Sequence, residues 1–394
     1  MELLSWGEII ARILIQFIPV WIALIVTFAV SITFKRRLGL YGKLFDSTIG
    51  MTGFALVMFW VFTGIFAGGF DMIITHNVLE QSGAMKNKLP GTPYTKMIGD
   101  VAEGTYPYYL LGGDNLGRDV FSRMVVGAWE VMKIAPFATL FAFMVGITLG
   151  LPAGYYGTKL DTLLSFLANL ILAFPVILLF YLLVTPEIVA TGIPVYMAGV
   201  LFIFPILFLV VLFNSRFFTQ PPKRNIYVAI TVLFGGWLYL GIAWNADPLG
   251  LIGFPPNLLV VFVAVVFVNS PTVFRIVRGL TMDIKSRDYV AAAQTRGEGP
   301  WYIMLWEILP NVRGPLIVDF CLRIGYTTIL LGTLGFFGLG LSPESPDWGS
   351  TINEGRKLLS IYPHPALPPA LSLLSLVLGL NLLADGLREE SLRD

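Results

Sequence analysis

Long apolar runs separated by short polar segments dominate this chain of 394 residues. A helix that crosses a bilayer needs about 20 mainly apolar residues, and nine runs of that kind occur. The runs are continuous rather than alternating between apolar and polar positions, which favours helices over strands. Backbone groups cannot stay unpaired in lipid, which again requires helices. We therefore predict an all-α polytopic membrane protein with about nine transmembrane helices, at residues 13–34, 49–70, 134–154, 163–184, 194–213, 226–244, 258–274, 315–340 and 365–384.

Composition supports a membrane environment. Hydrophobic residues make up 56% of the chain and charged residues only 13%, whereas a soluble domain carries about 25% charged residues. The net charge of +1 gives no sign of a nucleic-acid partner. The single cysteine, Cys321, is expected to be a small buried side chain. The acidic start of the chain and the absence of a small-residue cleavage site argue against a cleavable signal peptide.

Lysine and arginine mark alternate loops, and such loops face the cytoplasm. The loops after the first, fifth and seventh predicted spans are basic, whereas the loops at 185–193 and 245–257 hold no lysine or arginine. Nine crossings then put the N-terminus outside and the C-terminus in the cytoplasm. The loop at 71–130 is placed outside despite its five basic residues, because a loop of about 60 residues follows the charge rule weakly. Its part at 76–96 is predicted to be irregular and exposed.

One polar stretch, residues 286–311, interrupts the apolar pattern after the seventh predicted span. We predict two short helices that meet at Gly297, because glycine readily adopts the left-handed backbone that ends a helix. Pro300 suits the first turn of the second helix, and Pro310 is expected to end that helix. The first helix carries consecutive alanines at 291–293, and small side chains allow another backbone to approach closely. The stretch therefore predicts a docking surface for a partner protein.

This stretch resembles the EAA loop of ABC importer permeases, with Tyr289-Val290-Ala291-Ala292-Ala293, then Gly297, then Ile308-Leu309-Pro310-Asn311. Ala291 replaces the glutamate of the triplet, and Glu307 stands where the family often has histidine. Three further segments resemble motifs of the C-type permease of dipeptide and oligopeptide importers: residues 112–123 (GGDNLGRDVFSR), residues 337–340 followed by 346–350, and residues 381–388. Because all these motifs occur in the family's order, the chain is identified as a member of that family.

The resemblance accounts for about six of the nine predicted spans, so it implies a six-helix type I importer core with three extra helices. The implied segments are an extra N-terminal transmembrane helix with a basic cytoplasmic loop (1–47), the first core helix (48–70), an external loop with the GDNLGRD motif (71–130), core helices two and three (131–184), an inserted transmembrane hairpin (185–256), and core helices four to six (257–394) with the cytoplasmic coupling loop at 280–312.

The family also implies partners. The chain would pair with a second, B-type permease, one or two ABC ATPase subunits, an extracytoplasmic substrate-binding protein and membrane lipid, in the plasma (inner) membrane of a prokaryote. The sequence has no GxxxxGK[ST] phosphate loop, so ATP and magnesium are expected on the ATPase subunits, with no cofactor or metal on this chain. The expected cargo is a di- or oligopeptide. Nickel or another small solute is the alternative. A secondary transporter or a membrane enzyme is less favoured, because few charges lie within the spans.

The resemblance implies which residues form the ATPase-coupling surface: Tyr289, Ala291, Ala292, Ala293, Gly297, Trp301, Leu305, Glu307, Leu309 and Pro310. Trp301, Leu305 and Ile308 share one helical face by spacing. Arg296 and Glu307 are expected to make rim contacts to the ATPase.

Four other groups of residues stand out. The first is the polar group Asp114, Gly117, Arg118 and Asp119. One alternative is that it shapes an outer gate or a seat for the binding protein. The other is that it forms a local cap, with Arg118 paired to an acid. Asp319 and Arg323 lie four residues apart within the eighth span and are expected to pair, either along the transport pathway or as a link between helices. Glycines at 146, 150 and 154 predict close helix packing. His76 and Glu80 provide too few ligands for a metal site.

Overall fold

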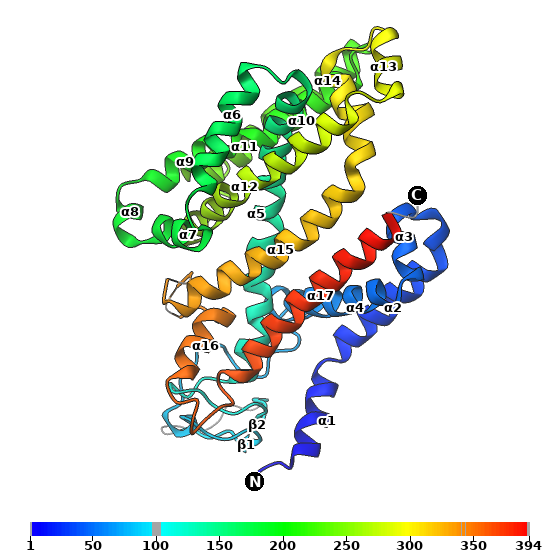
Figure 1. The fold of residues 1–394 in the computed structure, drawn as a ribbon. Coiled ribbons are helices and arrows are strands. Elements are labelled where there is room, and N and C mark those ends of the chain that lie inside the picture. Colours follow the sequence, from blue (N-terminus) through cyan, green and yellow to red (C-terminus); the bar gives the residue numbers. More distant parts are fainter. Residues whose placement is uncertain (1, 97–103, 340, 343, 392–394) are drawn as a thin grey trace. The chain divides into compact units, whose positions relative to one another are not determined.

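The computed structural model describes residues 2–96, 104–339, 341–342 and 344–391 (Figure 1). Its described part is built of helices, with one two-stranded antiparallel sheet that pairs β1 (Thr92–Pro93) with β2 (Tyr108–Tyr109). The chain divides into two compact units, Met1–Ala135 with Ile324–Asp394, and Pro136–Arg323. Two helices, α5 (Val120–Tyr156) and α15 (Arg313–Phe336), each begin in one unit and end in the other. The units are therefore described one at a time.

Within the described residues, eight helices are long and apolar enough to cross a membrane. They are Ile18–Arg37, Thr48–Gly69, Val120–Tyr156, Ile193–Arg216, Pro221–Trp244, Pro256–Ile284, Pro300–Phe336 and Leu367–Glu389. The fourth predicted span, 163–184, is instead a pair of helices, Lys159–Leu172 and Val176–Val184, bent by 82°. Pro175 lies at the bend and lacks an amide to continue the helix. Counted as one span, the pair brings the total to nine and confirms the predicted all-α class.

The first unit is organised around two helices that approach at glycines. At Gly53 of α4, an added Cβ would lie 2.2 Å from the backbone nitrogen of Leu383 on α17. At Gly379 of α17, an added Cβ would lie 2.7 Å from Cβ of Leu56. Any larger side chain would therefore separate the pair. The elements of this unit, besides its parts of α5 and α15, are α1 (Trp6–Gln16), α2 (Ile18–Phe34), η1 (Lys35–Arg37), α3 (Gly39–Lys43), η2 (Leu44–Asp46), α4 (Thr48–Gly64), η3 (Ile65–Gly69), η4 (Gly83–Met85), β1, β2, α16 (Trp348–Arg356) and α17 (Leu367–Ser391).

The first unit also contains a folded polar region, which we call the polar cap (residues 71–96, 104–119 and 344–366). Met85 is fully buried, and the rings of Tyr94 and Tyr109 stack with centroids 5.3 Å apart. The segment 76–96 is irregular as predicted, apart from η4 and β1, but it is not exposed throughout because Met85 and Tyr94 are buried. Aromatic side chains spaced through the segment supply enough apolar surface for a small core of its own.

The second unit is centred on α12 (Pro256–Ile284). In the most apolar 18-residue stretch of this helix 78% of the residues are buried, compared with 11% in α11 (Pro221–Trp244). The glycine stripe lies where α5 meets α12: an added Cβ would be 2.5 Å from Val273 at Gly146 and 2.9 Å from Val277 at Gly150. This confirms the predicted close packing. The remaining elements are α6 (Lys159–Leu172), α7 (Val176–Val184), α8 (Pro186–Ala190), α9 (Ile193–Leu201), α10 (Ile203–Arg216), α11 (Pro221–Trp244), α12 (Pro256–Ile284), α13 (Asp288–Thr295), α14 (Pro300–Tyr302), η5 (Ile303–Ile308) and η6 (Leu309–Val312).

The eighth span begins earlier than predicted. Pro310 does not end a helix, because the helical path runs without a gap from Pro300 to Phe336. The backbone widens to a π-helix in η5 and then tightens to a 3-10 helix in η6, which holds Pro310 in its first turn. A proline is tolerated where the regular α-helical bonds are already interrupted. Gly340, the predicted last residue of this span, lies outside the described residues.

Candidate functional site

The stretch predicted as a docking surface is a hairpin of α13 and the helical path α14–η5–η6, and we call it the Ala-rich hairpin (residues 288–312). The turn depends on Gly297, which has φ of +80°. The Glu298 amide donates to the Ala293 carbonyl at 3.2 Å, and the Gly297 amide donates to the Gln294 carbonyl at 2.9 Å. These two bonds form a Schellman motif, which satisfies carbonyls at the end of α13. Pro300 occupies the first position of α14, as predicted.

The predicted coupling residues divide into an exposed and a buried set. Tyr289, Ala291, Ala292, Gly297, Trp301 and Pro310 are exposed. Ala293 and Leu305 are buried, with exposed fractions of 0% and 4%, while Glu307 and Leu309 are half-buried. The structure therefore leaves a small face open on α13, and that face carries two alanines and a tyrosine.

The predicted apolar face of the second helix does not lie open for a partner. Leu305 and Ile308 pack into a cluster with Leu151 of α5 and Val277 of α12, and Trp301 alone of that face stays exposed. This chain's own core buries Leu305 and Ile308, so Trp301 is the member of the shared face that a partner can reach, and the coupling role itself stays a prediction. The hairpin is thus rooted in the second unit by apolar burial, which is a non-directional but strong source of stability.

Arg296 and Glu307 contact each other rather than standing free at a rim. The Arg296 guanidinium donates to the Glu307 carboxylate at 2.7 Å and so joins the two helices of the hairpin. A further bond fixes the hairpin's base, since Lys285 Nζ donates to the Gly154 carbonyl at 2.9 Å. These two contacts tie the end of α13 to η5 and the end of α12 to α5.

The GDNLGRD motif builds a buried charge cluster in the polar cap. The Asp114 carboxylate accepts from the Arg118 amide at 2.9 Å and from Arg118 Nε at 2.7 Å. Arg118 also pairs with Glu354 of α16, and only 2% of its side chain is exposed. Gly117 has φ of +76°, and an added Cβ would lie 1.9 Å from the Ser82 carbonyl. These contacts favour the local-cap alternative over a gate that faces open solvent.

The next two residues of interest in this cluster also point inward. Asp119 is fully buried, and its carboxylate accepts from the Ser122 amide at 3.0 Å and from the Thr75 hydroxyl at 2.6 Å. Arg123 is fully buried too, and it donates to the Ser345 carbonyl at 2.9 Å. Sequence reasoning missed Glu354 and Ser345, because no local pattern connects positions more than 220 residues apart.

Asp319 and Arg323 form the predicted pair within α15. Arg323 Nε and Nη2 donate to the two carboxylate oxygens of Asp319 at 2.9 and 3.2 Å. Their side chains are 16% and 11% exposed. The bidentate geometry offsets the cost of placing two charges in an apolar span.

His76 and Glu80 have separate contacts in the polar cap. A ring nitrogen of His76 lies 2.9 Å from the Tyr106 carbonyl, whereas Glu80 binds Lys96 at 2.9 Å and accepts from Tyr94 at 3.0 Å. The Lys96 ammonium group holds the pKa of Glu80 below its ordinary value. Burial and the hydrogen bond to Glu80 raise the pKa of Tyr94 to about 12. Within the described residues, no group of three His, Cys, Asp or Glu side chains is placed to hold a metal ion.

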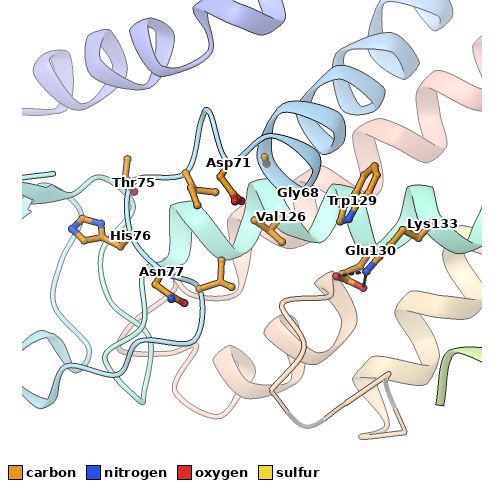
Figure 2. Close-up of a pocket in the computed structure, with 12 residues that line it drawn as sticks. Gly68, Asp71, Thr75, His76, Asn77, Val126, Trp129, Glu130 and Lys133 are labelled. Carbon is orange, nitrogen blue, oxygen red and sulfur yellow. Dashed lines mark hydrogen bonds and ion pairs between the residues drawn. The ribbon is translucent and has the colours of Figure 1, made fainter. Parts of the chain in front are cut away.

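A cavity of about 570 Å³ lies in the first unit, beside α5 (Figure 2). Glu130 and Lys133 form an ion pair at 2.8 Å on one side, next to the Trp129 ring. Asp71 and Asn77 come from the segment after α4. Two carboxylates and one ammonium group make this a polar cavity that no sequence motif indicated.

The comparisons with known proteins agree with this architecture. Residues 146–389 match the family described as binding-protein-dependent transport system inner membrane component. The chain belongs to this family. It is 30% identical over 287 residues to the glutathione transport system permease protein GsiD of Pectobacterium atrosepticum, covering 73% of each chain. It is 30% identical over 291 residues to the dipeptide transport system permease protein DppC of Haemophilus influenzae, covering 73% of this chain and 75% of that protein.

A further relative is the DppC protein of Alkalihalophilus pseudofirmus, with 28% identity over 297 residues, 75% of this chain and 74% of that protein. The predicted family resemblance is therefore confirmed. This family member is a multi-pass membrane protein and an ABC importer permease of the peptide and glutathione type.

Proposed function

We propose that this permease forms half of a translocation pathway for di- or oligopeptides and is driven by a cytoplasmic ATPase through the Ala-rich hairpin. The cargo assignment is supported by relatives named for the transport of dipeptides and of glutathione, which is itself a small peptide. Nickel or another small solute is the second candidate, tested by direct uptake of each solute into vesicles that contain the assembled transporter.

The coupling assignment depends on one observation: the hairpin is rooted in the second unit by buried apolar side chains and yet keeps a small-residue face open. Ala291 and Ala292 remain exposed beside Tyr289, while Val290 and Ala293 on the same helix are buried. Alanines let another protein's backbone approach closely, and the tyrosine adds an apolar anchor with a polar tip. A partner that closes around ATP could then displace the hairpin together with α12 and α15, which is a change between two states of different contacts.

The proposed topology puts the hairpin and the C-terminus in the cytoplasm of a prokaryote and the N-terminus outside its inner membrane. ATP and magnesium would be held by one or two partner ATPase subunits. A B-type permease would complete the pathway, and an extracytoplasmic binding protein would deliver the cargo. Nine crossings require the bent pair α6–α7 to count as one. A cysteine introduced at 217–225 should therefore resist a membrane-impermeant thiol reagent added to intact cells, and rapid labelling there would contradict this topology.

Gly297 provides the sharpest test of coupling, with Gly299 as its matched control. An added Cβ meets no atom within 4 Å at either position, but only Gly297 has a positive φ. Gly297→Val should therefore strain the turn by about 1–2 kcal/mol or more, whereas Gly299→Val should not. In the reconstituted transporter we expect Gly297→Val to hydrolyse ATP with much less uptake while it still inserts in the membrane. Normal uptake by Gly297→Val, with the ATPase bound, would exclude the coupling role.

A further inference from the structure

The polar contact between helix α10 of the predicted 185–256 insertion and the Ala-rich hairpin is made at Trp306. The indole Nε1 of Trp306 donates to the Ser215 hydroxyl at 3.1 Å. The guanidinium carbon of Arg216 lies 4.6 Å from the centroid of the Trp306 ring, within the range of a cation–π interaction. We call these three residues the brace contact.

Several features make the brace contact specific. Ser215 and Arg216 are the last two residues of α10, so they stand at its end rather than along its length. The Ser215 hydroxyl donates to the Leu212 carbonyl at 3.0 Å, which leaves its lone pairs to accept the indole proton. Val211 and Phe208, about one and two turns earlier, line a small cavity together with Trp301 and Leu305 of the hairpin. The same face of α10 therefore follows the hairpin over more than one helical turn.

Trp306 lies in the least regular part of its helix. It belongs to the π-helix η5, and the 3-10 helix η6 follows at once. Departures from α-helical geometry within a long helix often mark hinges or functional sites. This segment connects the open face of the hairpin to the membrane span α15. A displacement of the hairpin would therefore bend the chain here unless something supports it.

We propose that α10 braces this segment: Ser215 and Arg216 are positioning residues that hold Trp306, so that residues 303–312 move together with α10 instead of bending. The proposal rests on the proposed coupling function and adds a second route for movement, through the 185–256 insertion. It also gives that insertion a mechanical role that the six-helix core does not supply.

The first test measures local opening by hydrogen–deuterium exchange of the assembled transporter in lipid nanodiscs. Ser215→Ala with Arg216→Met removes one hydrogen bond and one cation–π contact. Exchange of the amides in 303–312 should become about five-fold faster or more, while α12 keeps its rate. Arg224→Met is the matched control. It also removes one arginine of the insertion, but the Arg224 side chain donates its hydrogen bond to the neighbouring Asn225. Arg216→Lys keeps a cation over the ring and should restore much of the protection.

Equal exchange in 303–312 for the double variant and the control would overturn the brace, as would an equal increase throughout α12. The second test measures ATP hydrolysed per solute transported, with Gly297→Val as the reference for uncoupling. A higher ratio in the double variant supports the brace. If Gly297→Val uncouples and the double variant does not, the brace is wrong and the coupling function stands. If Gly297→Val stays coupled, the coupling function falls, and the exchange result alone decides the brace.

Discussion

The polar cap and the Ala-rich hairpin are both rich in charge, but they use it in opposite ways. In the polar cap Arg118 is 2% exposed, and Arg123 of the adjoining α5 is 0% exposed; both bind acids or carbonyls within the same unit. In the hairpin, Arg296 is 54% exposed and the buried positions are apolar. The cap therefore satisfies its own polar groups, whereas the hairpin buries its root and leaves a face for another protein. Removing a charged side chain should therefore lower the stability of the protein strongly in the polar cap and only slightly in the hairpin.

The largest effect is expected from Arg118→Ala in the polar cap. Asp114 and Glu354 would lose their shared cation, and breaking a buried ion pair on one side costs about 3–5 kcal/mol. Thermal unfolding of the purified protein should show the loss. Lys86→Ala is the control, because Lys86 is exposed in the same region. If the two variants have the same melting temperature, the charge cluster does not stabilise the polar cap.

A smaller effect should separate two neighbouring alanines of α13. Ala293→Leu overfills a buried site and should destabilise the protein by about 1–3 kcal/mol. Ala292→Leu lies on the open face and should change stability by less than about 0.5 kcal/mol, while it weakens binding of the ATPase subunit. Thermal melting and co-purification of the ATPase measure the two effects. Equal ATPase binding by Ala292→Leu and the unmodified protein would argue against docking at this face.

A pH effect just below pH 6.5 should arise in the polar cap, from His364. Burial lowers the pKa of His364 below its ordinary value of 6.5, although the Gly113 carbonyl, 3.1 Å from its ring nitrogen, acts in the opposite direction. The protonated ring is thus less favourable in the folded than in the unfolded chain. The contribution of neutral His364 to the free energy of unfolding should be fully present above pH 6.5 and should be lost as the pH falls below that value. In His364→Gln the melting temperature should depend less on pH below 6.5. An unchanged dependence on pH would exclude His364 as the cause.

The smallest effect is expected from the exposed ion pair of the hairpin. Arg296→Met should cost about 0.2–1 kcal/mol, because solvent screens the attraction to Glu307. The loss should shrink at high salt. A double-mutant cycle with Glu307→Gln measures the coupling energy of this ion pair directly. A coupling energy as large as the loss of stability in Arg118→Ala would remove the contrast between the two regions.

Much of the architecture could be predicted because the constraints are local. The thickness of a bilayer sets the length of an apolar run, so each predicted span overlaps an apolar helix or, at 163–184, a bent helix pair. The third, seventh and eighth helices nevertheless extend ten or more residues beyond one predicted end. The turn at Gly297 followed from the same kind of argument, since a positive φ is a property of one residue. The family motifs then identified the kind of permease from residues that lie in order along the chain.

The sequence by itself therefore determined the membrane class, the hairpin's turn and the family. Only the tertiary structure decided which side of each element is used. In the folded chain Leu305 and Ile308 are buried in the core. Arg118 pairs with Glu354, 236 positions away in the sequence. Ser215 and Arg216 contact Trp306, about 90 positions away. Periodicity shows that a helix has an apolar face, but burial depends on which distant segment covers that face. Such contacts form only when the whole unit folds.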